Sequence, residues 1–215
     1  MSNPWKLLNE ALAKAGIPRQ IVQRVKGFDF ELRGPVNIIV NTGIDATPYS
    51  RILLKYAPRL TVPNEIEMAV RCMMQRKGFR DAVPWLVSLF KGYPSNGLSE
   101  AHLWAVGLAI YKLDDKRFYR EIISICRDKR YITARQMLMG VLARAKSDEA
   151  FDALVSCLGD PTVRAHAIEA LGRIGRREAI SVLERLAVQK GLYEYKAKET
   201  ALRRLRRVGK SGRRG

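Results

Sequence analysis

Residues 160–183, Asp-Pro-Thr-Val-Arg-Ala-His-Ala-Ile-Glu-Ala-Leu-Gly-Arg-Ile-Gly-Arg-Arg-Glu-Ala-Ile-Ser-Val-Leu, have the pattern of two short helices joined by a tight turn. Asp160 can cap a helix N-terminus, Pro161 fits a first helical turn, and Gly175 permits a sharp exit. Apolar residues recur at helical spacing on both sides of that turn, at Val163, Ala167, Ala170, Leu171 and Ile174, and then at Ala179, Ile180 and Leu183. Because a unit this small cannot bury its own apolar face, the pattern predicts a stack of similar units.

Weaker copies of this unit recur along most of the chain. Turn residues mark the junction between the two helices of each copy, at Gly16, Gly43, Gly78, Asp114-Asp115, Ser147-Asp148, Gly175 and Gly209. The second helices are predicted to begin near Pro18, Pro48, Ala82, Ala150 and Ala179. The resulting period of roughly 27 to 36 residues is typical of helical repeat proteins.

One segment, residues 35–42, is open to two interpretations. Its β-branched run, Val36-Asn37-Ile38-Ile39-Val40, would suit a strand. Pro35 suits the first turn of a helix, and Gly43 suits the residue just past a helix end. Since no neighbouring segment is predicted to supply a partner strand, we predict a short helix here.

The unit at 160–183 resembles a HEAT repeat, in the short form also seen in phycobilisome-lyase-like proteins. The matching residues are Asp160-Pro161, Val163-Arg164, Ala167, Ala170-Leu171-Gly172, Ile174-Gly175, Ala179-Ile180 and Leu183. The resemblance is strongest over residues 130–190, extends over 62–130 and is weakest over 1–60. The tetratricopeptide pattern of similar period is missing. We therefore expect an all-α, right-handed α-solenoid of about six HEAT-like helical hairpins plus a terminal basic helix.

Composition predicts one soluble domain. The 215 residues are 47% hydrophobic, and no Gly/Ser-rich or Pro-rich linker interrupts the repeats, so we place a single solenoid over residues 1–209 and a basic tail over 210–215. We expect a cytoplasmic, intracellular protein without a membrane span, because no apolar run is long enough to cross a bilayer. The three cysteines, Cys72, Cys126 and Cys157, are expected to be buried apolar residues.

The net charge of +18 points to a polyanionic partner. The chain has 39 Lys and Arg residues and only 21 Asp and Glu residues. Such an excess of positive charge disfavours a compact state through self-repulsion. From residue 160 onward the chain has 15 basic and 6 acidic residues. Nucleic acid, an anionic membrane surface and an acidic protein are the candidate partners.

The end of the chain is the clearest candidate for phosphate contact. Ala201, Leu202, Leu205 and Val208 form an apolar face at helical spacing. The basic residues lie away from that face, at Arg203, Arg204, Arg206 and Arg207, followed by Lys210, Arg213 and Arg214 in the tail. A terminal repeat needs a polar outer face in any case, but this one is rich in Arg, whose fork of donors matches phosphate.

The repeat register adds further candidates. Arg76, Arg144, Arg173 and Arg207 occupy equivalent places near the end of a first helix, and Arg176 and Arg177 lie close by. A row of cations at repeat spacing can follow a nucleic-acid backbone, whereas cations in a last helical turn also complement the helix dipole. A second aligned set, Arg135, Arg164 and Lys198, is interpreted differently. By resemblance to HEAT repeats, Arg135 and Arg164 are expected to pair with turn acids such as Asp160 and to hold the stack together.

No catalytic or metal-binding constellation stands out. His102 and His166 have no partner at metal-ligand spacing, no phosphate-cradling glycine loop is present, and no cofactor is predicted. Trp5, Trp85, Trp104 and Tyr111 are expected to pack in the core. The sequence thus favours a binding module that docks a basic surface on nucleic acid or a ribonucleoprotein. A protein–protein adaptor that grips an acidic partner is the alternative. A HEAT-like DNA glycosylase using Trp104 with Asp114 or Asp115 is a second alternative.

Overall fold

The computed structural model describes residues 3–74 and 78–211, with side chains described as far as residue 207. The chain forms two compact units, Met1–Asp114 and Asp115–Gly215, and each is described by itself. The single solenoid over 1–209, its handedness and its repeat count stay predictions.

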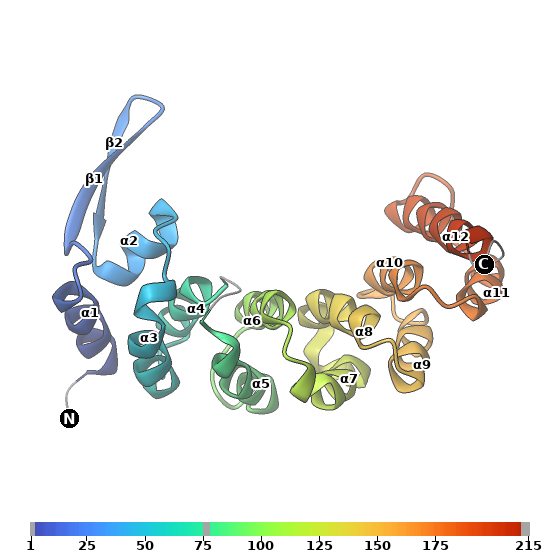
Figure 1. Ribbon diagram of the computed structural model, residues 1–215, viewed down its shortest axis with the longest axis horizontal. Helices are drawn as coiled ribbons and strands as arrows, with labels where there is room; N and C mark the ends of the chain where they lie inside the picture. The colour runs from blue at the N-terminus through green and yellow to red at the C-terminus, as the bar shows by residue number, and fades with distance from the viewer. Residues whose placement is uncertain (1–2, 75–77, 212–215) are drawn as a thin grey trace. The chain divides into compact units, whose positions relative to one another are not determined.

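The first unit contains six α-helices and one β-hairpin among its described residues (Figure 1). The elements are α1 (Pro4–Lys14), β1 (Gln20–Val25), β2 (Phe28–Arg33), α2 (Pro35–Thr42), α3 (Ser50–Tyr56), α4 (Pro63–Cys72), α5 (Val83–Lys91) and α6 (Glu100–Leu113). Short 3₁₀ helices span Thr47–Tyr49, Ala57–Arg59 and Arg80–Ala82. Helix α6 packs against α4 and α5, and α1 packs against α2 and α3. Their shared core includes the fully buried side chains of Leu8, Ile38, Leu53 and Phe90.

The β-hairpin corrects the prediction that a second helix begins at Pro18. Strands β1 and β2 pair antiparallel, with Val25 opposite Phe28 next to the turn. Lys26 and Gly27 form that turn with φ of 50° and 87°, the two positive values that a tight hairpin turn of right-handed twist requires. Alternating apolar residues then make a strand more favourable than a helix. The fold is therefore mostly, not wholly, helical.

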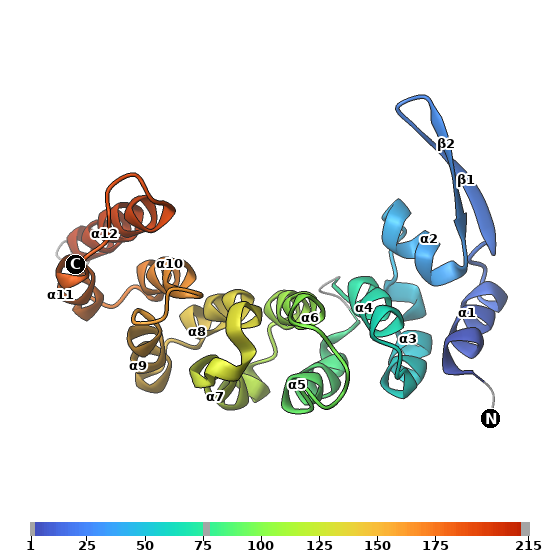
Figure 2. The same cartoon turned by 180° about the vertical axis from the view of Figure 1, so that it is seen from behind.

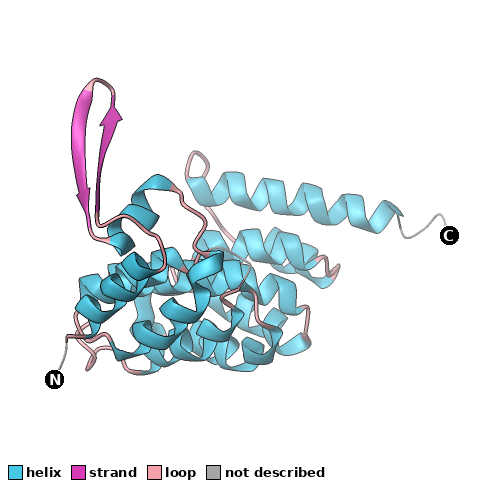
Figure 3. Cartoon of the chain, turned by 60° about the vertical axis from the view of Figure 1, so that its left-hand side comes forward, coloured by secondary structure: helices cyan, strands magenta, loops and turns pink. Residues whose placement is uncertain are grey.

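The hairpin stands out from the helices of its own unit, as its magenta ribbon shows (Figure 3). One of its two faces carries five apolar side chains, those of Ile21, Val25, Phe28, Phe30 and Leu32. Phe28 is 71% exposed and Phe30 is 52% exposed, whereas Ile21 and Leu32 near the base are half-buried. The opposite face carries the Arg24–Asp29 and Arg33–Glu31 ion pairs.

The prediction of a helix over residues 35–42 is confirmed. Pro35 occupies the first turn of α2, and Gly43 follows its end in the left-handed conformation. Val36, Ile38 and Ile39 are buried, so the β-branched run packs a helical face into the core of the first unit.

The second unit consists of helices α7 to α12 over its described residues. Their bounds are α7 (Tyr119–Arg127), α8 (Met139–Ala145), α9 (Asp148–Cys157), α10 (Arg164–Ile174), α11 (Glu178–Arg185) and α12 (Tyr193–Ser211), with 3₁₀ helices over Lys116–Phe118 and Lys129–Leu138. Helix α10 contacts both α8 and α12, and α7 contacts α9. Within this unit, α8, α10 and α12 lie on one side, and α7, α9 and α11 lie on the other (Figures 1 and 2).

The predicted turns within the second unit are largely confirmed. Gly175 ends α10 with a left-handed φ of 79°. Ser147 caps α9, where its side chain accepts a hydrogen bond from the backbone N–H of Ala150. The turn predicted at Gly209 is wrong, because α12 continues through that residue to Ser211. The predicted helix start at Asp160-Pro161 is wrong, because α10 begins at Arg164, three residues after Pro161, and the carboxylate of Asp160 accepts instead from the backbone N–H of Thr162 in the preceding turn.

The aligned set Arg135, Arg164 and Lys198 holds successive helices together. Each side chain donates to a backbone carbonyl near the end of the preceding helix: Arg135 to Cys126 at 3.0 Å, Arg164 to Leu158 at 2.7 Å, and Lys198 to Leu186 at 2.8 Å. These carbonyls have no partner within their own helix, so the cations cap them. The structural role predicted for Arg135 and Arg164 is confirmed.

Two of these cations also reach an acid in the following repeat. Arg135 is 2% exposed, and its guanidinium lies 2.5 Å from the carboxylate of Asp160. Arg164 pairs with Glu194 at 3.5 Å rather than with Asp160. Burial would raise the pKa of Asp160, but hydrogen bonds from Thr162 and Arg135 outweigh it and lower that pKa to about 2.

Cys72, Cys126 and Cys157 are buried and free, as predicted. Trp5, Trp85 and Tyr111 are half-buried, whereas Trp104 is 37% exposed, so the expected core position of Trp104 is wrong. Among the described residues, no helix is both long and apolar enough to span a lipid bilayer.

Candidate nucleic-acid interface

Helix α12 lies against α10 through an unusually close contact between small residues. A Cβ placed on Gly172 would lie 2.7 Å from the Cβ of Ala201, so only glycine permits this approach. The predicted apolar face of α12 is buried at Ala201, Leu202 and Leu205, and the side chain of Val208 lies outside the described part. Because this apolar face packs against α10, the basic residues on the other faces of α12 are exposed at the surface.

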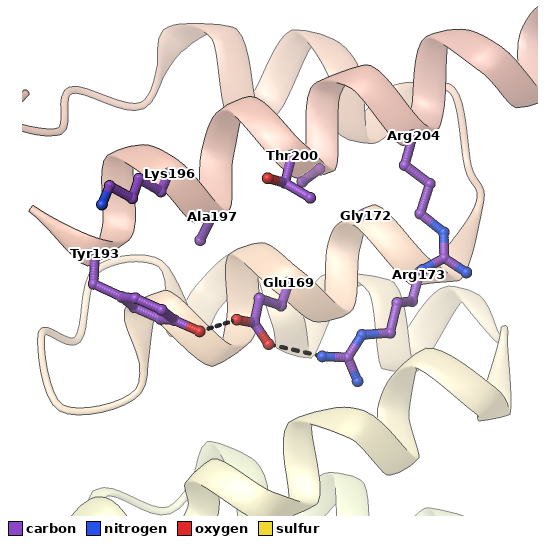
Figure 4. A pocket seen from close by; sticks show the side chains of 9 residues that line it. Glu169, Gly172, Arg173, Tyr193, Lys196, Ala197, Thr200 and Arg204 are labelled. Carbon is purple, nitrogen blue, oxygen red and sulfur yellow. Dashed lines mark hydrogen bonds and ion pairs between the residues drawn. The ribbon is translucent and has the colours of Figure 1, made fainter.

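A groove of about 370 Å³ follows this contact. Helix α10 and helix α12 both line it, the first with Glu169, Gly172 and Arg173, and the second with Tyr193, Lys196, Ala197, Thr200, Ala201 and Arg204. We call it the α10–α12 groove. Tyr193 lies towards one end, whereas Arg204 reaches from α12 towards Arg173 at the other end (Figure 4).

The α10–α12 groove is cationic. Arg173, Lys196 and Arg204 line it together with a single carboxylate, that of Glu169. Glu169 already accepts a hydrogen bond from Arg173 at 2.7 Å and another from the hydroxyl of Tyr193. Within the described part of the chain, no carboxylate lies within ion-pair distance of Lys196 or Arg204. The groove therefore offers positive charge to a ligand.

The surroundings of Tyr193 and His166 set the protonation of these two groups. The hydrogen bond between Glu169 and the hydroxyl of Tyr193 raises the pKa of that phenol, so Tyr193 remains a neutral donor. One turn earlier on α10, burial lowers the pKa of His166, and the nearby guanidinium of Arg173 lowers it further against the opposing effect of Glu169. Since His166 is thereby kept neutral near pH 7, the positive charge here comes from Arg and Lys.

The other predicted cations are in different settings. Arg176 is engaged by the carboxylate of Asp148 at 2.5 Å and lies over the ring of Phe151 at 4.7 Å. Arg206 pairs with Glu184 of α11 at 2.7 Å. Arg144 is half-buried, and Arg177 is exposed; each has an interaction partner of its own.

The remaining predicted residues are exposed or undescribed. Arg203 and Arg207 are exposed on α12. Arg76, Arg213 and Arg214, together with the side chain of Lys210, lie outside the described residues. Of the predicted cations whose side chains the structure describes, only Arg173 and Arg204 line the α10–α12 groove.

Sequence reasoning missed Tyr193, Lys196, Thr200 and Glu169. A signal for three of them was present, because residues 193, 196, 200 and 204 recur at spacings of three and four and so share one face of a helix. Glu169 gives no such signal, since its role depends on how closely α12 approaches α10.

Asp115, one of the two acids of the glycosylase alternative, is not an open carboxylate. Asp115 is 3% exposed, and its carboxylate accepts hydrogen bonds from the side chain of Arg117, the shortest at 2.6 Å. This carboxylate also accepts from the backbone N–H of Arg117, as a cap of the following 3₁₀ helix. The role of Asp115 is therefore structural, since its carboxylate caps this 3₁₀ helix. No group of three or more His, Cys, Asp and Glu residues that could hold a metal ion occurs in the described ranges.

Comparison with known proteins agrees with the predicted repeat class. A family model of HEAT repeats matches residues 119–203, from α7 into α12. A search of curated proteins finds none that matches the chain. The second unit is thus built of HEAT repeats, as the sequence predicted.

Proposed function

We propose that this HEAT-repeat chain is a binding module that docks the basic surface of its second unit on nucleic acid or a ribonucleoprotein. The observation that carries the proposal is the α10–α12 groove, which Arg173, Lys196 and Arg204 line together with one carboxylate that is already engaged. HEAT repeats are typical of proteins that bind partners through extended surfaces.

Phosphate is the ligand group that suits these cations best. A guanidinium presents parallel N–H donors to two phosphate oxygens, and charge-assisted hydrogen bonds of this kind are stronger than neutral ones. Arg203 and Arg207 are exposed on the same helix as Arg204 and extend the positive surface beyond the groove. Such contacts fix the register of a nucleic-acid backbone without reading its bases.

The cations that form ion pairs contribute less to this surface. Arg176 and Arg206 each have a carboxylate partner, so a phosphate would have to compete with Asp148 or Glu184 for them. The net charge of +18 supports the same partner class, because an anionic polymer offsets the repulsion among 39 basic residues. We therefore assign the phosphate contacts chiefly to Lys196, Arg203, Arg204 and Arg207, and also to Arg173, whose ion-pair partner Glu169 is shared with the hydroxyl of Tyr193.

The proposal is tested by the salt dependence of binding to a fluorescently labelled oligonucleotide. A plot of the logarithm of the binding constant against the logarithm of the salt concentration has a negative slope. Each phosphate contact that is lost reduces the magnitude of this slope by about 0.7 to 0.9. The double variant Arg173→Gln/Arg204→Gln should therefore reduce the slope by about 1.5 and weaken binding by about tenfold or more at ~100 mM salt.

The matched control removes the same charge elsewhere in the second unit. Lys116 and Arg120 are exposed and lie before and within α7. The variant Lys116→Gln/Arg120→Gln should leave the slope unchanged. A wild-type Kd no tighter than millimolar at ~50 mM salt, for single-stranded and duplex oligonucleotides alike, overturns the proposal. Recovery of one dominant acidic protein in a nuclease-treated pull-down would instead favour the adaptor alternative.

A further inference from the structure

We infer that the α10–α12 groove takes one nucleotide of a single strand, with its base on the ring of Tyr193 and its phosphate between Arg173 and Arg204. The inference rests on the proposed function and adds to it a preference for unpaired nucleic acid. It is carried by the order of chemistry along the groove, which runs from the ring of Tyr193, past the carboxylate of Glu169 and a set of small side chains, to the guanidinium groups of Arg173 and Arg204.

Tyr193 is an exposed aromatic residue whose position is nevertheless held. The residue is 62% exposed, and its hydroxyl donates a hydrogen bond to Glu169 on the neighbouring helix. A largely exposed ring that is held by its polar end loses little conformational freedom when a base stacks on it. Stacking on an aromatic side chain accepts any base, because every base has a π face.

Arg173 and Arg204 form the opposite end of the groove. They come from different helices, and the Arg204 side chain reaches towards Arg173 (Figure 4). Glu169 compensates the charge of Arg173 by a hydrogen bond of 2.7 Å, whereas no carboxylate in the described ranges pairs with Arg204. A phosphate placed there receives donors from both sides.

The middle of the groove suits a sugar. Gly172, Ala197 and Ala201 contribute no side chain larger than a methyl group, and Thr200 contributes a hydroxyl from α12. Lys196 supplies a further cation along the same wall. The volume of about 370 Å³ falls in the range of sites that hold one small molecule rather than a flat duplex surface. A base inside a duplex is stacked on its neighbours and cannot lie on Tyr193 without leaving the helix.

The experiment compares single-stranded and duplex oligonucleotides of equal length by fluorescence anisotropy, with two substitutions at one position. Tyr193→Leu keeps an apolar side chain but removes the ring, whereas Tyr193→Phe keeps the ring and removes only the hydroxyl. We expect Tyr193→Leu to weaken single-strand binding about tenfold with an unchanged salt slope, and to leave duplex binding as it is. Tyr193→Phe should retain most of the single-strand affinity.

A second measurement locates the base directly. Ultraviolet cross-linking to an oligonucleotide that contains 4-thiouracil, followed by mass spectrometry, should yield a modified peptide that contains Tyr193. The inference is overturned if Tyr193→Leu binds single strands as the wild type does, or if the cross-links fall elsewhere while binding persists. In that case salt-dependent binding that is sensitive to Arg173→Gln/Arg204→Gln would leave the proposed function standing. Failure of the wild type to bind any oligonucleotide would overturn both.

Discussion

At the scale of single residues, the buried guanidinium of Arg135 links three segments of the second unit. It donates to the carbonyls of Ile132 and Cys126 and to the carboxylate of Asp160. Burying an unpaired charge costs much free energy, and the Arg135 side chain is only 2% exposed. The guanidinium can therefore stay buried only while its partners remain in place. Removing one partner leaves the other charge buried and unpaired.

Asp160→Asn should therefore destabilise the protein by about 3 kcal/mol at pH 7, because the guanidinium of Arg135 loses its counter-ion. Urea unfolding followed by circular dichroism measures the change. Asp152→Asn is the matched control, since Asp152 is exposed on the neighbouring helix α9 and should change stability by less than about 0.5 kcal/mol. Equal effects of the two substitutions would contradict the role assigned to Asp160.

The same carboxylate predicts a pH dependence. Its pKa is about 2 in the folded protein against an ordinary value of 3.8, so the unfolded chain binds this proton more tightly. The stabilisation is present above pH ~4 and is lost as the pH falls towards ~2, by about 2 kcal/mol in total. Unfolding free energies measured between these pH values should fall more steeply for the wild type than for Asp160→Asn. Parallel curves would show that another group controls acid stability.

Prediction from sequence was uneven at this scale. The structural role of Arg135 and Arg164 follows from their place in the repeat, yet the acid that pairs with Arg164 is Glu194, because stacking brings the next repeat's acid to it. In the candidate site, Arg173 could be named from its place in the repeat, and Arg204 from the basic residues at the end of the chain. Tyr193 and Glu169 could not, since their contact depends on how α12 lies on α10.

At the scale of elements, the close contact of α10 and α12 creates the groove. Gly172 lies within α10, two residues before its end at Ile174, and glycine within a helix is normally unfavourable compared with alanine by about 1 kcal/mol. Its place is explained by the 2.7 Å approach that any Cβ would make to Ala201. The low helix propensity of Gly172 is therefore offset by the close packing of α10 and α12 that glycine permits.

Gly172→Val should push α12 away from α10, lowering stability by about 1 to 3 kcal/mol. It should also weaken oligonucleotide binding, although no cation is removed. Thermal unfolding and fluorescence anisotropy check the two effects. Gly159→Ala is the control, because its Cβ would meet only the carbonyl oxygen of Ser156 at 3.8 Å. Stability of the Gly172 variant equal to that of the control would contradict the close contact.

The hairpin offers a contrasting prediction. Phe28→Ser should change the free energy of unfolding by less than about 0.5 kcal/mol, because the ring is 71% exposed and packs on little. Leu53→Ala, in the buried core of the same unit, should lower it by about 3 kcal/mol. Urea unfolding of the two variants gives the comparison. A large loss in Phe28→Ser would mean that the aromatic face is covered.

Local signals explain which elements could be predicted. Helix α2 followed from Pro35 and Gly43 despite its β-branched interior, because end signals are stronger than propensity over so short a segment. The hairpin was missed because Pro18 was interpreted as the first residue of a helix. The Lys26-Gly27 turn, with positive φ at both residues, was the competing signal.

At the scale of the whole molecule, the charge of +18 acts on stability as well as on binding. Repulsion among like charges disfavours the compact state and is screened by salt. We therefore expect the Tm to rise between ~50 and ~500 mM NaCl. Differential scanning calorimetry measures the shift. A Tm that falls over this range would mean that attractive ion pairs, such as Arg135–Asp160, outweigh the repulsion.

The hairpin has a further consequence for the behaviour of the protein in solution. Its sheet contains two strands in the described part of the chain, so each strand has one edge whose backbone groups face no neighbouring strand. Such an edge invites strand addition by another molecule, especially beside exposed aromatic rings. Each strand is only six residues long and carries arginine, at Arg24 in β1 and Arg33 in β2. Because the strands are short and carry charged side chains of both signs, their edges are poor templates for strand addition, which protects this exposed element against aggregation.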